Sequence, residues 1–220
     1  MRSSLRAFRD LALSPAIDVV VSDLDGVLRR FDPQLWRDLD AHLGAERGTA
    51  YRAVLGSPFL QEVVRGRASH AQWRERAVAD LIASGSDPDS ARAAVAHWSG
   101  TPAQVDPEVE DILEDARYED KRVFVFTNGT DRVREELDAL GLLAPLGPDG
   151  RFLLNSAELG AAKPDREAFS RAHTRIEEIL GAAVQRSAVA FLDDSPRHVQ
   201  GAIAFSWQAI LLEDGEDGEA

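Results

Sequence analysis

Two pairs of closely spaced aspartates each follow an apolar segment of the chain. Asp23 and Asp25 come directly after a β-branched run, and Asp193 and Asp194 come directly after a second apolar run. Close carboxylates repel by about 4 kcal/mol per pair at an effective dielectric constant near 20, so a cation must lie among them if the pairs meet. Mg²⁺ prefers oxygen ligands and is typically held by one or two carboxylates. We therefore predict a magnesium site.

Sequence context separates the first pair from other acidic doublets. Further Asp-x-Asp sequences lie in helical or turn contexts, and only Asp23-Leu24-Asp25 follows an apolar run and precedes a glycine. A helix cap or an Asx turn is the structural alternative for this pair. For Asp193 and Asp194, taken alone, the alternative that they simply begin a helix stays equally open.

Two further segments could hold an anion beside these acids. Thr127 offers a hydroxyl at the end of an apolar run, and the backbone N–H groups of Asn128 and Gly129 lead into a helix, as in known anion sites. Lys163 stands just before another helix and is one of two lysines among 25 basic residues. This rarity favours a specific role for Lys163 over that of an exposed surface lysine.

The elements that carry these residues alternate between strand and helix. The patterns predict strands at residues 17–22, 122–127, 187–192 and 207–212, and helices at residues 107–118, 131–140 and 165–180. This alternation predicts an α/β fold, a doubly wound and mostly parallel sheet with helices on both faces. Ligands of such sheets bind beyond the carboxyl ends of the strands, where the polar residues gather.

Residues 32–100 interrupt the alternation with consecutive amphipathic helices. The predicted domains are a core, residues 1–31 and 101–220, and an inserted helical domain, residues 32–100. Asp32-Pro33 and Thr101-Pro102 are the predicted hinges. The insertion holds three tryptophans that recur at helical spacing with aliphatic residues, which favours packing over a binding platform: Trp36, Trp73 and Trp98.

Composition excludes several classes of function. The 220 residues contain no cysteine, which excludes disulfides, thiolate metal sites and thiol nucleophiles. A net charge of −13 argues against nucleic-acid binding, and no apolar run approaches the roughly 18 residues of a membrane helix. Residues 1–16 lack the features of a secretory signal and predict an extra helix or a frayed arm. We expect a cytoplasmic protein with a disordered acidic tail.

Four segments, in chain order, resemble the four motifs of the haloacid dehalogenase-like (HAD) hydrolase superfamily. They are VVVSDLDGVL, VFVFTNGT, SAELGAAKPDREAF and AFLDDSPRHVQGA. The resemblance spans the whole core, and the helical insertion is similar to the type-1 cap of that superfamily. It implies phosphoryl transfer through an aspartyl-phosphate, with Mg²⁺ as cofactor.

The resemblance also implies a role for each motif residue. Asp23 would be the nucleophile, and Asp25 the general acid and base whose carbonyl also touches the metal. Asp194 would bind Mg²⁺ directly and Asp193 through water or at the edge of the site. The phosphoryl group would be bound by Thr127, Asn128, Gly129 and Lys163. True dehalogenases of the superfamily lack the second aspartate, so Asp25 favours phosphorus chemistry.

Residues outside the four motifs have weaker signals. Arg65 and Arg67 form a basic turn between cap helices that could contact an anionic substrate, although a solvated turn is the alternative for each. Arg29 and Arg30 follow the first motif, and their role is open. His198 is the histidine nearest the predicted site, and we interpret it as a residue of a helix surface.

These patterns favour a Mg²⁺-dependent phosphatase that acts on a small phosphorylated metabolite, with a sugar phosphate suggested by the resemblance alone. We expect a monomer or homodimer without nucleic-acid or membrane partners. A phosphomutase of the beta-phosphoglucomutase kind is the main alternative, because it shares every core residue. A phospho-acceptor signalling module is disfavoured by the order of its motifs, and a silent binding protein by the completeness of the core motifs.

Overall fold

A five-stranded parallel sheet forms the centre of this computed structural model, which describes residues 1–213. The strand order is β5-β4-β1-β6-β7. The bounds are β1 (Val19–Ser22), β4 (Arg122–Thr127), β5 (Leu153–Asn155), β6 (Val189–Asp193) and β7 (Gln208–Leu211). β1 pairs in parallel with both β4 and β6, so the strands that carry the two aspartate pairs are neighbours. The predicted doubly wound α/β fold is confirmed, and the expectation of a disordered acidic tail concerns residues outside those described.

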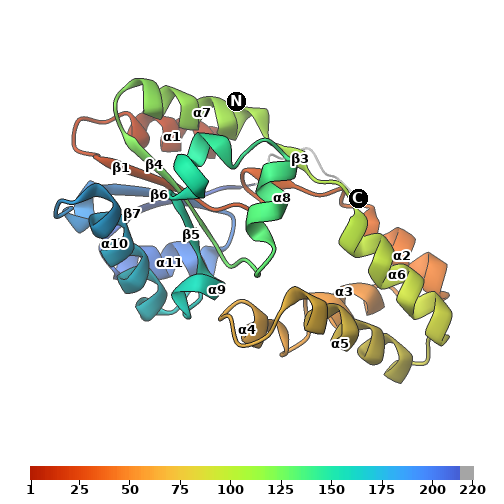
Figure 1. Cartoon of the computed structure of the whole chain (residues 1–220). Helices are drawn as coiled ribbons and strands as arrows, with labels where there is room; N and C mark the ends of the chain where they lie inside the picture. Colours follow the sequence, from red (N-terminus) through yellow and green to blue (C-terminus); the bar gives the residue numbers. More distant parts are fainter. Residues whose placement is uncertain (214–220) are drawn as a thin grey trace.

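Two layers of helices cover the sheet (Figure 1). α1 (Ser3–Ala12), α7 (Pro107–Tyr118) and α8 (Val133–Ala139) pack on one face, and α10 (Arg166–Leu180) and α11 (Pro196–Ala204) pack on the other. Successive residues of a strand point to opposite faces. Val20 accordingly joins the first apolar cluster, whereas Val19 and Val21 join the second. The strands are therefore buried on both faces, which explains why they read as continuous apolar runs.

The N-terminal segment is a helix that belongs to the core. Leu5 and Phe8 of α1 are fully buried in the first apolar cluster. Lys121 donates hydrogen bonds to the carbonyl oxygens of Ser14 and Ile17, at 2.9 and 2.6 Å, and so fastens the turn between α1 and β1. Of the two alternatives for residues 1–16, the extra helix is correct.

Residues 32–100, the predicted cap, contain an apolar cluster of their own. Its helices are α2 (Leu35–Leu43), α3 (Thr49–Val54), α4 (Leu60–Val63), α5 (His70–Ala83) and α6 (Pro88–Gly100). Trp73 and Trp98 pack edge to face with ring centroids 4.7 Å apart, and Trp73 Nε1 donates to the Val54 carbonyl at 3.0 Å. The tryptophans therefore pack inside the cap, as predicted.

The two chain segments that join the cap to the core pair with each other. β2 (Arg29–Arg30) and β3 (Gln104–Val105) form a short antiparallel ribbon. The ribbon lies on the core side of the predicted hinges, Asp32-Pro33 and Thr101-Pro102, and below the word hinge means this ribbon. Neither strand was predicted, because two residues are too few for a periodic pattern.

The edge strand β5 was also not predicted. Its three residues lie between two 3₁₀ turns, η1 (Ala144–Leu146) and η2 (Pro148–Gly150), and the short helix α9 (Ser156–Leu159). A third such turn, η3 (Arg186–Ala188), fills the first residues of the strand predicted at 187–192. Strand lengths near the lower limit therefore account for most differences from the prediction.

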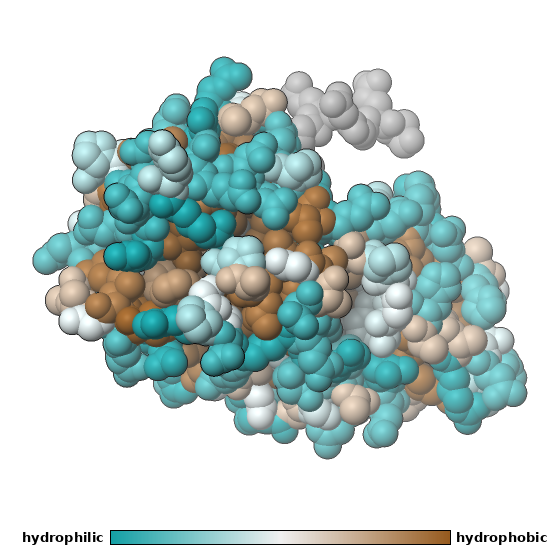
Figure 2. Space-filling model, turned by 45° about the horizontal axis from the view of Figure 1, so that its top comes forward, coloured by the Kyte–Doolittle hydropathy of each residue, from teal (hydrophilic) through white to brown (hydrophobic). Residues whose placement is uncertain are grey.

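Hydrophilic residues cover most of the face of the molecule drawn in Figure 2, as expected for a chain with 29% charged residues. Within residues 1–213, no helix combines the length and the apolar character that crossing a membrane requires.

Candidate active site

The buried ammonium group of Lys163 links the carboxyl ends of β1 and β6. Lys163 Nζ lies 2.9 Å from Asp23 Oδ1 and 2.7 Å from Asp193 Oδ2. Its third contact is a hydrogen bond of 2.9 Å to the carbonyl oxygen of Phe126 in β4. An ammonium group has three donors, so all of them are used. The alternative of an exposed surface lysine is wrong, because Lys163 is 3% exposed.

Burial and charge act together on this cluster. Burial and the neighbouring Asp193 carboxylate raise the pKa of Asp23 well above its ordinary value, against the effect of Lys163. Burial also disfavours charge on Asp193, yet Lys163 and His198 hold the pKa of Asp193 below its ordinary value. Burial works against the charge of Lys163, but Asp23 and Asp193 outweigh it and raise the pKa of Lys163. An additional cation would favour the ionised form of Asp23 that a nucleophile requires.

Asn128 fastens the loop that carries Lys163 to the end of β4. The Asn128 side chain donates to the Lys163 carbonyl and accepts from the Lys163 N–H, both at 2.9 Å. Its side chain thus supports Lys163, and the predicted contact with a phosphoryl group would use the backbone N–H of Asn128. Thr127 is 2% exposed at the same strand end. A Cβ at Gly129 would lie 2.9 Å from Asn155 Oδ1, so a larger residue in this turn would have to displace the Asn155 side chain.

The two residues of the second aspartate pair, Asp193 and Asp194, contact different parts of the site. Both carboxylate oxygens of Asp193 accept hydrogen bonds, Oδ2 from Lys163 at 2.7 Å and Oδ1 from the Ser195 N–H at 2.9 Å. Asp194 instead lies against the first motif, because a Cβ at Gly26 would be 2.0 Å from Asp194 Oδ2. Gly26 also has a φ of +82°, which favours glycine. The loop after Asp23 is therefore shaped around the Asp194 carboxylate.

The donor set fits a hard divalent cation. Asp23, Asp193 and His198 each offer an atom, and these atoms lie within 4.8 Å of one another. Since the oxygens of Asp193 already accept hydrogen bonds, Asp23 and Asp194 are the carboxylates best suited to bind a metal directly. The carboxylates supply oxygen ligands, which Mg²⁺ prefers, whereas His198 would supply a nitrogen.

His198, which we interpreted as a residue of a helix surface, is part of the site. His198 Nδ1 lies 3.0 Å from Asp193 Oδ1, so the histidine supports a site residue from the first turns of α11. The interpretation as a helix-surface residue is wrong for this reason. The spacing allows this contact but does not require it, because His198 stands five positions after Asp193 and a helix that starts at Pro196 brings its first turn back beside the strand end.

Asp25 points to a different partner from Asp23. Its carboxylate forms a two-fold ion pair with Arg29, with Nε to Oδ1 at 2.6 Å and Nη2 to Oδ2 at 3.0 Å. Arg29 Nη1 continues to Glu136 Oε2 of α8 at 2.8 Å. Arg29, whose role the sequence left open, is therefore a neighbour of the site, whereas Arg30 pairs with Asp106 at 2.8 Å.

The basic turn of the cap contacts the core beside Lys163. Arg65 Nη2 lies 2.7 Å from Asp165 Oδ2, and Arg67 pairs with Glu62 inside the cap. Between them, a Cβ at Gly66 would lie 2.2 Å from the carbonyl oxygen of Ala157 in α9. Both arginines are thus held by carboxylates. Arg67, with half of its side chain exposed, agrees with the alternative of a solvated turn.

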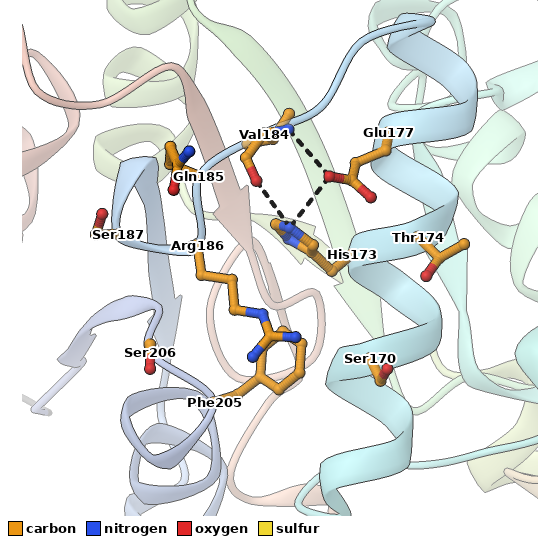
Figure 3. Close-up of a pocket in the computed structure, with 10 residues that line it drawn as sticks. All are labelled: Ser170, His173, Thr174, Glu177, Val184, Gln185, Arg186, Ser187, Phe205 and Ser206. Atoms are coloured by element: carbon orange, nitrogen blue, oxygen red, sulfur yellow. Dashed lines mark hydrogen bonds and ion pairs between the residues drawn. The ribbon is translucent and has the colours of Figure 1, made fainter.

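A separate cavity of about 490 Å³ lies at the other end of the strands from Asp23 (Figure 3). It is lined by residues of α10, by the segment that precedes β6 and by Phe205 and Ser206, which precede β7. The ring of His173 lies 3.0 Å from the Val184 carbonyl oxygen and accepts a hydrogen bond of 3.3 Å from Trp207. This cavity therefore opens at the amino ends of β6 and β7, away from Asp23.

The fold of this chain is similar to that of several solved structures. A HAD family enzyme of Bacteroides thetaiotaomicron, solved as a magnesium complex, superposes with a TM-score of 0.64 at 18% identity, covering 92% of this chain and 96% of that chain. A predicted HAD-like hydrolase of Porphyromonas gingivalis gives 0.61 at 20% identity, with 92% and 94% covered. The L-2-haloacid dehalogenase of Xanthobacter autotrophicus gives 0.60 at 19% identity, with 88% and 76% covered. These similarities show the fold.

No curated protein matches the sequence closely enough to count as a relative. The sequence model of one family, haloacid dehalogenase-like hydrolase, matches residues 17–206, which include all four motifs and the cap. The chain belongs to the haloacid dehalogenase-like hydrolase family.

Proposed function

We propose that this hydrolase is a Mg²⁺-dependent phosphatase that acts on a small phosphorylated metabolite through an aspartyl-phosphate. The observation that carries the proposal is the contact of Lys163 with Asp23 and Asp193, with Asp194 against the same loop. It gives one place where a nucleophilic carboxylate, a fixed cation and candidate metal ligands meet.

The residues of the chain divide the reaction into two steps. Asp23 attacks phosphorus, the bond from phosphorus to the ester oxygen breaks, and Asp25 gives its proton to the leaving oxygen. Water then attacks the phosphorus, its proton passes to Asp25, and the bond to Asp23 breaks to release inorganic phosphate. Proton transfer by a positioned side chain is typically worth about 10²–10⁴ in rate.

Lys163 and the residues at the end of β4 bind the phosphoryl group in this proposal. The charge that spreads over the phosphoryl oxygens in the transition state is stabilised by Lys163 Nζ and by the Thr127 hydroxyl, together with the N–H groups of Asn128 and Gly129. Mg²⁺, held by Asp23, Asp194 and the Asp25 carbonyl with Asp193 at the edge, would neutralise charge between the nucleophile and the phosphoryl group. The Bacteroides relative has been solved with magnesium and inorganic phosphate, which supports this assignment.

Asp25 favours phosphate esters over haloacids as substrates. An alkoxide leaving group needs a proton when its bond breaks, whereas a halide ion leaves without one. A second carboxyl group beside the nucleophile therefore serves the first reaction and is unnecessary for the second. The Xanthobacter enzyme, solved with chloropropionic acid covalently bound, remains the relevant comparison for a test.

The cap supplies the selectivity in this proposal. Its basic turn already contacts the core beside Lys163, where Arg65 or Arg67 could exchange a carboxylate for an anionic substrate. A phosphomutase would share all the core chemistry and differ only in what the cap retains. The cytoplasm remains the proposed location, and a monomer or homodimer the proposed state.

A screen of phosphorylated metabolites with and without Mg²⁺ tests the proposal. We expect release of free phosphate from at least one of them that depends on Mg²⁺. Formation of an isomer from a hexose phosphate without free phosphate would instead identify a mutase. Halide release from 2-chloropropionic acid without phosphate release from any ester would overturn the proposal.

A further inference from the structure

Asp25 is an exposed side chain held in one orientation. Its side chain is 46% exposed, so it could rotate freely if it were unpaired. Both of its oxygens are instead bound by Arg29, which presents two parallel N–H donors at 2.6 and 3.0 Å. A bidentate pair of this kind fixes direction as well as distance.

Arg29 is itself rigid. Its side chain is 8% exposed, and its third donor binds Glu136 of α8 at 2.8 Å. Its guanidinium also lies 5.4 Å from the ring centroid of Phe31. Burial opposes the charged form, but Asp25 and Glu136 outweigh it and raise the pKa of Arg29. The arginine is thus a fixed, charged support with partners on both sides.

The backbone of Arg29 connects the catalytic loop to the hinge. The Arg29 N–H donates to the Leu24 carbonyl at 2.7 Å, and the Gly26 N–H donates to the Arg29 carbonyl at 2.9 Å. In the hinge, Arg29 pairs with Val105, which belongs to the segment that returns from the cap. Arg29 therefore contacts the loop of Asp25 with both its side chain and its backbone, and its position in β2 places it opposite Val105 of the returning segment. α8, which carries Glu136, lies on the side of the core that faces the hinge (Figure 1).

We propose that Arg29 is a positioning residue that orients Asp25 and ties this orientation to the hinge between cap and core. For proton transfer to the leaving group, Asp25 Oδ2 leaves Arg29 Nη2 and carries the proton, while Oδ1 stays on Arg29 Nε. The inference rests on the proposed phosphatase function. It does not extend to Arg30, the adjacent hinge residue, whose side chain pairs with Asp106.

This role predicts a dependence on the leaving group. A 4-nitrophenolate leaves readily without a proton, because its ring withdraws electrons, whereas phenolate of nearly the same size benefits from protonation as its bond breaks. Misplacing Asp25 should therefore slow the transfer of the phosphoryl group from phenyl phosphate to Asp23 and spare the transfer from 4-nitrophenyl phosphate. A general loss of structure would slow both transfers equally.

The test measures kcat/KM for both esters with Mg²⁺ in wild type, Arg29→Gln and Arg29→Lys, because kcat/KM reports the steps up to departure of the leaving group and excludes the later hydrolysis of the aspartyl-phosphate, in which Asp25 acts as the base for both esters. We expect Arg29→Gln to lower kcat/KM for phenyl phosphate by about tenfold or more and kcat/KM for 4-nitrophenyl phosphate by less than about threefold, since general acid catalysis contributes about 10²–10⁴. The diagnostic quantity is the ratio of the phenyl phosphate value to the 4-nitrophenyl phosphate value. Arg29→Lys keeps the charge but offers one point contact, so its ratio should lie between those of Arg29→Gln and the wild type. Glu136→Gln, which removes only the outer support, should change the ratio in the same direction by a smaller factor.

Arg30→Gln is the matched control, since it removes a neighbouring hinge arginine with a carboxylate partner and should leave the ratio at the wild-type value. Equal losses for the two esters in both Arg29 variants, or an unchanged ratio, would overturn the inference while leaving the phosphatase in place. A wild-type protein that hydrolyses neither ester nor any metabolite with Mg²⁺ would overturn the proposed function, and this inference with it. If Arg29→Gln does not fold, the ratio in Arg29→Lys and Glu136→Gln decides.

Discussion

Lys163 is the residue on which the electrostatics of the site depend. It is buried between Asp23 and Asp193, and its ammonium group is the charge that allows two carboxylates to share one interior position. Asn128 holds the backbone of Lys163 in place, so a lysine far along the chain reaches the end of β1. The charges of Lys163, Asp23 and Asp193 therefore form a charge balance, in which removing one group leaves another buried without its partner.

The balance predicts the stability of a lysine variant. Lys163→Met leaves Asp23 and Asp193 buried without their cation and should lower the free energy of unfolding by about 3 kcal/mol in magnesium-free buffer, as when one partner of a buried ion pair is removed. Adding Asp193→Asn to this variant should restore part of the loss, because one of the stranded carboxylates is removed. Urea unfolding measures both.

Lys121→Met is the matched control in the same measurement. It removes the other lysine of the chain, whose partners are neutral carbonyl groups of Ser14 and Ile17. We expect a smaller cost of about 1–2 kcal/mol, the range for lost hydrogen bonds. A Lys163→Met protein as stable as the wild type would contradict the charge balance described here.

Among the elements, the loops at the carboxyl ends of β1, β4 and β6 could be predicted from the sequence, because each follows an apolar run and begins with polar residues. The short elements could not. β5 has three residues and the hinge strands have two each, and such lengths show no periodicity. They form because a neighbouring strand offers hydrogen bonds, which is a property of the folded chain.

The same limit applies to individual contacts between elements. The Asp-x-Asp-Gly segment and Lys163 stood out by type and spacing, but the bond of His198 to Asp193 and that of Arg29 to Asp25 depend on side-chain directions. Sequence spacing alone places His198 on α11 without saying which face of the helix turns inward. Contacts of this kind become visible only when the strand end and the helix are placed together.

The turn between α4 and α5 gives a test at this scale. Gly66 has a φ of +70°, and a Cβ there would meet the Ala157 carbonyl oxygen at 2.2 Å. Gly66→Ala should move the cap turn away from α9 and lower kcat/KM by about tenfold or more, because small misplacements over a reacting group are costly. Steady-state kinetics with the best substrate of the metabolite screen measures this.

Gly44→Ala separates strain from contact. Gly44 ends α2 at a φ of +60°, and an added Cβ would have nothing within 4 Å. The substitution should therefore lower the free energy of unfolding by about 1–2 kcal/mol through backbone strain, without a comparable loss of kcat/KM. Equal kinetic effects of the two substitutions would show that the contact of Gly66 with the core has no role in activity.

In the whole molecule, the cap and the core meet around the site at more than one point. Arg65 reaches Asp165, and the N–H of His70 at the start of α5 donates to Asp131 Oδ1 at 2.7 Å. Figure 1 shows the cap helices grouped beside the core and joined to it through the hinge. A substrate enclosed between the two would be shielded from water, and the cap residues would select it. The core would then supply the chemistry and the cap the choice of metabolite.

The most direct test of the account is to find where the phosphoryl group goes. Asp25→Asn should still accept a phosphoryl group from 4-nitrophenyl phosphate with Mg²⁺ and should lose it slowly, because the base that activates water is gone. Mass spectrometry of the quenched protein should then find one phosphoryl group on the peptide that contains Asp23, and none when Asp23→Asn is added. Phosphate release that continues undiminished in Asp23→Asn, or a phosphoryl group on another residue, would contradict the account.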